Sequence, residues 1–305
     1  MKKKLVVFII IVLSITLAAC GKNETNSSET KQKGNSKIEI VASFHAIGEF
    51  AKAVGGNKVE VKVIIPDGTE PHDFEPKAMD IARMSEARLF VYNGLGMEAW
   101  AEKVIASINS TELVKVDTST GADLITNGKP EDIKQHGQYD PHLWLSLKGA
   151  QKQAQNIEAA LVKVDPSNKD YYNKNYKEFY NKLEKLYIEY LNKFKTIKNK
   201  DFVTGHAAFA YLCRDFGLEQ NSVESVFAEG EPSANRLREL VDYCKANAIK
   251  VVFLEDMASP KISETLAREV NAKVAKIYTI ESRENNMDYV ESMTYNLQKI
   301  YESLK

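Results

Sequence analysis

Cysteine is scarce in this chain of 305 residues, which has three: Cys20, Cys213 and Cys244. No Cys-x-x-Cys sequence and no cysteine–histidine pair occurs at the spacing of a structural zinc site, which argues against a cysteine-based metal centre. Cys213 and Cys244 fall within helical patterns in the last third of the chain. They can form a disulfide outside the cytoplasm or lie buried as two free thiols, and the sequence leaves both possibilities open.

Other patterns that would indicate a function are also missing. The chain has 41 lysines and arginines against 42 aspartates and glutamates, and no basic stripe interleaved with aromatic residues points to nucleic acid. No His-Glu-x-x-His sequence occurs, so the helix motif of zinc metalloproteases is absent. With 44% hydrophobic residues, the composition is that of a soluble globular protein of about two domains.

The N-terminus carries the pattern of an export signal. Lys2, Lys3 and Lys4 precede an apolar run, residues 5–17, which is too short for a comfortable transmembrane helix. The closing Leu-Ala-Ala-Cys resembles a bacterial lipobox, which implies that Cys20 is lipidated; the alternative is an ordinary cleaved signal with a chance cysteine. The next residues, 21–37, lack apolar side chains and are predicted to be a disordered tether. It would hold a folded domain at the extracytoplasmic face of the cell membrane.

Three of the five histidines occupy equivalent places along the chain. His72 lies in Glu-Pro-His-Asp-Phe-Glu-Pro, His142 in Asp-Pro-His-Leu-Trp, and His206 in Gly-His-Ala-Ala-Phe. Each comes just before a predicted helix, and His72 and His206 follow predicted strands, whose carboxyl ends are where open α/β sheets bind ligands. A lone histidine beside a turn is usually a surface residue, but three in the same setting indicate one metal site.

Strands and helices alternate through most of the chain, which predicts parallel βαβ units. We expect strands at 38–43, 59–65, 89–92 and 113–116, and again at 202–204, 222–227, 250–254 and 275–278. The fold class is therefore α/β, with two three-layer lobes. Its expected parts are a signal peptide (1–19), a lipid-anchored tether (20–37), a first lobe (38–168), a linking helix (169–198) and a second lobe (199–305).

One long helix is expected between the lobes. Large apolar residues recur at steps of three and four from Tyr172 to Phe194, with lysine, glutamate and asparagine between them. No glycine or proline interrupts this stretch. We therefore expect a stiff strut that limits hinge motion.

Three imidazoles leave a divalent metal one ligand short of a tetrahedron, and a carboxylate would complete it. Glu255 and Glu281 both end strands in the second lobe, and the pattern does not choose between them. Nitrogen ligands favour zinc, whereas more carboxylates would favour manganese. His45 also follows a strand, but its phenylalanine neighbours indicate that it lines the pocket, with metal ligation as the rival role. His136 lies in a polar segment, 118–139, and is expected to face solvent, with a transient metal contact as the alternative.

These motifs in this order, with Glu-Pro-Ser at 231–233 and the lipobox, resemble the zinc-binding lipoproteins of bacterial ABC importers, the ZnuA/AdcA type of solute-binding protein family 9. The resemblance covers nearly the whole mature chain. It implies two α/β lobes bridged by a rigid helix, with Zn²⁺ captured between them and delivered to a membrane permease. Carried over by motif, it gives the ligands as His72, His142, His206 and Glu281. Glu255 becomes an acidic neighbour that does not touch the metal.

The resemblance has one departure and leaves alternatives. Many zinc members carry a histidine-rich loop before Asp-Pro-His, whereas this chain has only His136 there, so a scavenging loop is not expected. Manganese-preferring relatives usually replace the third histidine with glutamate, so His206 indicates zinc, with Mn²⁺ as the alternative cargo. A zinc-dependent hydrolase is disfavoured, because a glutamate in the fourth position leaves no room for an activated water.

A surface adhesin that shares the scaffold is the remaining alternative. Impaired growth under zinc limitation after deletion of the protein would distinguish an importer component from an adhesin. We expect a monomer that is not an enzyme, and whose partners are Zn²⁺ and the permease.

Overall fold

The computed structural model describes residues 37–127, 138–226, 232–255 and 260–305, which belong to one compact unit, Lys37–Lys305. The predicted signal peptide and tether, Cys20 and His136 lie outside the described residues. None of the described helices is long and apolar enough to cross a membrane. The buried residues of both hydrophobic cores lie between Ile40 and Leu304, so both cores belong to this unit.

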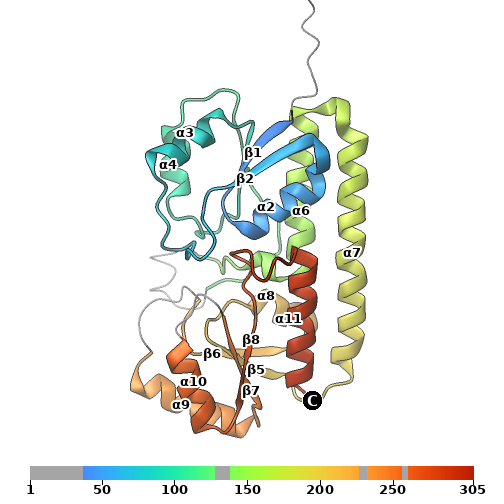
Figure 1. Ribbon diagram of the computed structural model, residues 1–305. Helices are drawn as coiled ribbons and strands as arrows, with labels where there is room; N and C mark the ends of the chain where they lie inside the picture. The colour runs from blue at the N-terminus through green and yellow to red at the C-terminus, as the bar shows by residue number, and fades with distance from the viewer. Residues whose placement is uncertain (1–36, 128–137, 227–231, 256–259) are drawn as a thin grey trace, which may run out of the picture. The chain divides into compact units, whose positions relative to one another are not determined.

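The first half of the chain forms a four-stranded parallel sheet (Figure 1). Its strands are β1 (Ile38–Ala42), β2 (Val59–Val63), β3 (Leu89–Tyr92) and β4 (Val114–Asp117), in the spatial order β2-β1-β3-β4. The connecting helices are α2 (His45–Gly55), α3 (Ala78–Glu86) and α4 (Ala101–Ser107). The central strands β1 and β3 are mostly buried and apolar, as strands covered on both faces must be.

The second half forms a second four-stranded parallel sheet with the same order of strands. Its strands are β5 (Asp201–Thr204), β6 (Glu219–Ser222), β7 (Val251–Leu254) and β8 (Lys273–Lys276), in the order β6-β5-β7-β8. Its helices are α8 (Ala210–Phe216), α9 (Ala234–Ala246), α10 (Pro260–Glu269) and α11 (Tyr289–Ser303).

Two strands of this sheet lie earlier in the chain than the sequence predicts. We expected strands at 222–227 and 275–278, but β6 ends at Ser222 and β8 ends at Lys276. Both are edge strands with polar sequences, Glu-Gln-Asn-Ser and Lys-Val-Ala-Lys. The predictions were based on apolar residues such as Val223 and Ile277, which are buried just beyond the strand ends.

The long helix is present as α7 (Lys169–Lys195), a helix of 27 residues. It follows α6 (Leu147–Val164), and it contacts α2 and α6 beside the first sheet and α8 and α11 beside the second (Figure 1). Its buried side chains all belong to the predicted apolar stripe: Tyr172, Phe179, Leu183, Leu186, Tyr190 and Phe194. The α/β fold class, with two parallel sheets and a long helix, is therefore confirmed.

Each sheet has one point where the chain reverses its direction of winding. The reversal falls between β1 and β3 in the first sheet and between β5 and β7 in the second. Loops that leave the carboxyl ends of such strands are where open α/β sheets bind ligands. His45 follows β1, His206 follows β5 and Glu255 follows β7, so the fold directs these residues to two ligand-binding edges.

Hydrogen bonds also join loops and helix starts beside the first sheet to those beside the second. They are His45 N–H to Glu281 O (3.1 Å), Gly68 N–H to Ser282 Oγ (2.8 Å), Trp144 Nε1–H to Thr279 O (2.7 Å) and Tyr211 O–H to Asp140 O (2.7 Å). Several of these residues flank predicted metal ligands. The two ligand-binding edges therefore meet at one place.

Cys213 on α8 and Cys244 on α9 are both buried and both free. The question that the sequence left open is thus settled in favour of two thiols. Burial raises the pKa of Cys244 to about 11, so this thiol is protonated at neutral pH and behaves as a small apolar residue.

Candidate metal centre

The three histidines predicted as ligands form one cluster. Each offers one ring nitrogen, and these nitrogens all lie within 4.8 Å of one another. The ring centroids of His142 and His206 are 4.8 Å apart, and that of His72 is 5.6 Å from His142 and 6.4 Å from His206. Within the described part of the chain, no other group of histidine, cysteine or acidic residues has this metal-binding arrangement.

His72 lies in the loop between β2 and α3. A turn at Pro66, whose carbonyl accepts the Thr69 N–H at 3.1 Å, leads the chain away from the strand. The His72 N–H then donates to Oε1 of Glu70 at 3.4 Å. His72 is half-buried, whereas the other two histidines are buried, so the cluster is most accessible on the side of His72.

His142 is held by the aspartate two residues before it. Oδ1 of Asp140 accepts the His142 backbone N–H at 2.8 Å and lies 2.9 Å from the ring Nδ1. An ionised carboxylate only accepts, so Nδ1 carries the proton and Nε2 keeps its lone pair. Nε2 is buried and has no hydrogen-bond partner among the described residues. A carboxylate on the far nitrogen of a metal-binding histidine fixes its tautomer and raises its basicity.

His206 is oriented by the backbone. Its Nε2 lies 2.7 Å from the carbonyl oxygen of Val226, which can only accept, so Nε2 carries the proton and Nδ1 keeps the lone pair. Burial, and then the neighbouring His142, lower the pKa of His206 to about 3. The ring is therefore neutral throughout the physiological range of pH, as a metal ligand has to be.

The two candidate glutamates differ in what their oxygens bind. In Glu255, Oε1 accepts the His206 N–H at 3.2 Å and Oε2 accepts the Gly205 N–H at 3.1 Å. In Glu281, Oε2 accepts the Thr279 hydroxyl at 2.8 Å, and Oε1 is buried without a hydrogen-bond partner among the described residues. Glu255 thus positions the His206 backbone, whereas Glu281 has an oxygen free for a cation. An unsatisfied buried polar group costs about 1–3 kcal/mol.

Glu281 does not belong to the tight cluster of mutually close ligand atoms, which contains the histidines alone. Its backbone carbonyl accepts the N–H of His45, so its loop is bonded to the start of α2. This bond fixes the Glu281 backbone beside the start of α2.

Several carboxyl groups around the cluster have raised pKa values. Burial, and then the charge of Glu70, raise the pKa of Glu281 well above its usual range. Burial also raises the pKa of Glu70, and it raises that of Glu255 to about 8. Burial raises the pKa of Glu224 as well, with a further contribution from Glu70. A divalent cation at the histidines would offset the repulsion between these groups when they are ionised.

His45 lies at the first turn of α2 and is buried, but it does not join the cluster. Burial lowers its pKa, so the ring is neutral near pH 7. Its backbone N–H bond to Glu281 places it beside the predicted site, in agreement with the expectation that it lines the pocket.

Sequence reasoning missed the groups that orient the ligands. Asp140 entered only as part of Asp-Pro-His, although an aspartate two residues before a histidine could have signalled a carboxylate partner. Thr279 likewise stands two residues before Glu281 without having been singled out. The Val226 carbonyl gives no sequence signal, because every residue has one.

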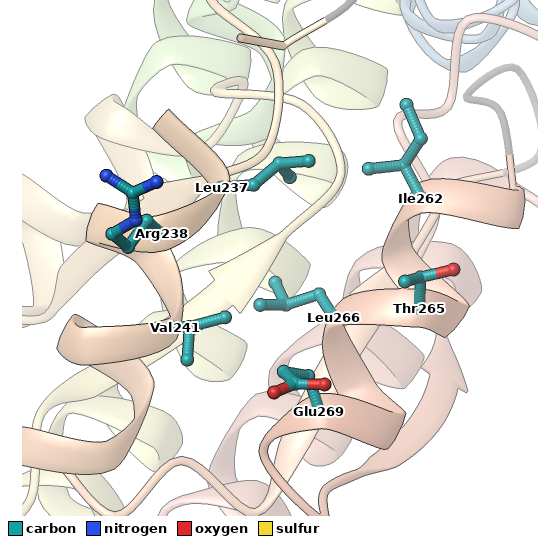
Figure 2. A pocket seen from close by; sticks show the side chains of 7 residues that line it. All are labelled: Leu237, Arg238, Val241, Ile262, Thr265, Leu266 and Glu269. Atoms are coloured by element: carbon teal, nitrogen blue, oxygen red, sulfur yellow. The ribbon is translucent and has the colours of Figure 1, made fainter. Parts of the chain in front are cut away.

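A separate pocket of about 280 Å³ lies between α9 and α10. Figure 2 shows its lining: Leu237, Arg238, Val241, Ile262, Thr265, Leu266 and Glu269. It contains no histidine and is mostly apolar, so its chemistry is not that of a metal site.

Comparison with known proteins gives consistent matches. A model of the family described as zinc-uptake complex component A, periplasmic, matches residues 40–303. The high-affinity zinc uptake system protein ZnuA of Bacillus subtilis is 38% identical over 310 residues, or 97% of this chain and 96% of that protein. The zinc-binding lipoprotein AdcA of Streptococcus pneumoniae is 32% identical, over 98% of this chain and 60% of that protein.

A solved structure is similar as well. The laminin-binding protein Lmb of Streptococcus agalactiae, described as bifunctional with adhesin and metal-transporting activity, matches with a TM-score of 0.81 and 34% identity. The match covers 88% of this chain and 100% of that one.

Replacing His206 by alanine removes a proposed ligand. Loss of a residue that only hydrogen-bonds to a ligand weakens metal binding by roughly 10–100-fold, and we expect His206→Ala to weaken zinc binding by more than that. The metal-free variant should keep the far-ultraviolet circular dichroism of the parent. His45→Ala is the matched control, since it removes a buried histidine outside the cluster, and it should weaken zinc binding less than His206→Ala does. Unaltered zinc affinity in His206→Ala would remove this residue from the site.

Zinc binding is expected to release protons from Glu281. Burial raises the pKa of this carboxyl well above its usual range, so a proton competes with the cation for it. Apparent affinity should consequently fall as pH falls. Calorimetry in buffers of different ionisation enthalpy measures the release, which Glu281→Gln should reduce. Equal release by the parent and the variant would contradict this assignment.

Proposed function

The chain belongs to the family of periplasmic zinc-uptake complex components, and from this premise we propose that it captures Zn²⁺ outside the cytoplasm and delivers it to the permease of an ABC importer. The observation that carries the proposal is the cluster of three buried or half-buried histidines with nitrogens within 4.8 Å of one another. Without a cation, such a cluster raises the free energy of the folded protein, because nitrogen lone pairs lie side by side in a poorly hydrated space.

The proposed ligands are His72, His142, His206 and Glu281. Three neutral imidazoles and one carboxylate oxygen form the four-coordinate set that zinc prefers. Glu255 is left out, since both of its oxygens accept backbone N–H groups. The surplus of imidazole over carboxylate is what favours Zn²⁺ over Mn²⁺ as the cargo.

Capture without catalysis follows from the same ligand set. A catalytic zinc keeps an open position for water, whereas Glu281 would fill the fourth position here. Because Lmb is described as both an adhesin and a metal transporter, an adhesive role would add to metal capture and not replace it.

The remaining parts of the chain fit a tethered receptor. Lipidation at Cys20 would anchor a monomer to the extracytoplasmic face of the membrane, and residues 20–37 would give it reach toward the permease. Within the folded unit, the proposed division is a first lobe (38–168), a linking helix (169–198) and a second lobe (199–305). Since α7 contacts helices beside both sheets, we infer that release depends on local movement of ligand loops.

A chelator-competition titration of the metal-free unit, residues 37–305, tests the proposal. We expect one Zn²⁺ per chain, bound tightly enough that excess Mn²⁺ does not displace it. Tighter binding of Mn²⁺ would keep the transport role but overturn the choice of metal. Failure to bind either ion would overturn the proposed function.

A further inference from the structure

The two oxygens of Glu281 are in different environments. The side chain is 2% exposed, and its Oε2 accepts the hydroxyl of Thr279 at 2.8 Å. Its Oε1 has no hydrogen-bond partner in the described part of the chain. A carboxylate can bind a metal through one oxygen or through both. Here one oxygen is already engaged by a hydroxyl that lies two residues away.

Thr279 is itself held firmly in place. It is 2% exposed, and its carbonyl oxygen accepts the Trp144 Nε1–H at 2.7 Å. The indole ring of Trp144 is completely buried, and its centroid is 5.2 Å from that of His142. The hydroxyl of Thr279 is therefore positioned through a side chain that also packs on a proposed ligand.

The residue between Thr279 and Glu281 confirms that this turn is constrained. Ile280 has a φ of 58°, in the left-handed region that a β-branched residue rarely adopts. Its side chain is 1% exposed. Such a conformation persists only where the surroundings enforce it, and here bonds from Trp144 and His45 hold the carbonyls on either side.

We propose that Thr279 determines metal specificity by restricting Glu281 to one-oxygen binding. The inference rests on the proposed function, in which Glu281 supplies the fourth ligand. While the Thr279 hydroxyl donates to Oε2, that oxygen shares its electron density with the hydrogen bond, so Oε1 is the better ligand and the metal receives three nitrogens and one oxygen. Zinc is satisfied by four ligands. Manganese prefers octahedral, oxygen-rich sites, and so it gains more than zinc from a second carboxylate oxygen.

The test compares Thr279→Val, which keeps the shape and removes the hydroxyl, with the parent protein. Chelator competition with Zn²⁺ and with Mn²⁺ gives the ratio of the two affinities. We expect the preference for zinc to fall by about 10–100-fold, the range seen when an outer partner of a ligand is removed. Thr279→Ser retains a hydroxyl and should restore most of the preference.

Thr294→Val is the matched control. The Thr294 hydroxyl also donates within the protein, to the carbonyl of Val290 on α11 at 2.7 Å, but the residue is exposed and outside the site. This variant should keep the parent's ratio of affinities. If Thr279 had a purely structural role, Thr279→Val would weaken the binding of both metals equally and leave the ratio of affinities unchanged. That result would overturn the inference.

Cobalt loading supplies an independent readout. Four-coordinate Co²⁺ absorbs visible light far more strongly than five-coordinate Co²⁺, so the parent should give the intense spectrum and Thr279→Val the weaker one. A five-coordinate spectrum in the parent, or identical spectra in both, would refute the role of Thr279 while leaving zinc capture intact. Failure of the parent protein to bind zinc would instead refute the proposed function, and the inference with it.

Discussion

Three imidazoles can share one poorly hydrated space only if each is neutral and each directs its lone pair inward. The structure orients two of the rings by occupying their outer nitrogens: Asp140 accepts from Nδ1 of His142, and the Val226 carbonyl accepts from Nε2 of His206. Burial then keeps the pKa of His206 at about 3, so protons do not compete for this ring near neutral pH. These rings are thus oriented for a cation before one binds. The entropy cost of ordering them therefore belongs to folding and not to metal binding.

The two sheets supply this arrangement through their equivalent reversal points. Beyond β5 and β7, the carboxylate of Glu255 binds the N–H groups of Gly205 and His206. Beyond β3, the side-chain amide of Asn93 donates to the carbonyl of Pro141, directly before His142, at 2.9 Å. The loops that carry His142 and His206, two proposed ligands distant in sequence, are therefore held by side chains at strand ends.

Much of the fold followed from the sequence because it depends on local patterns. The apolar stripe of α7 and the alternation of strands and helices were read correctly, whereas the edge strands β6 and β8 were displaced because their polar residues carry no apolar signature. The three histidines were found through their shared setting. The choice between Glu255 and Glu281 came from family resemblance, and its physical support, the oxygen left free on Glu281, depends on tertiary contacts that no local pattern encodes.

We infer that three imidazoles and a single carboxylate oxygen hold one cation. The zinc K-edge X-ray absorption spectrum of the loaded protein reports this coordination shell. We expect four nitrogen and oxygen neighbours at about 2.0–2.2 Å, with the outer-shell scattering of three imidazole rings. A sulfur neighbour at about 2.3 Å, or a six-coordinate shell of oxygen without imidazole scattering, would contradict it.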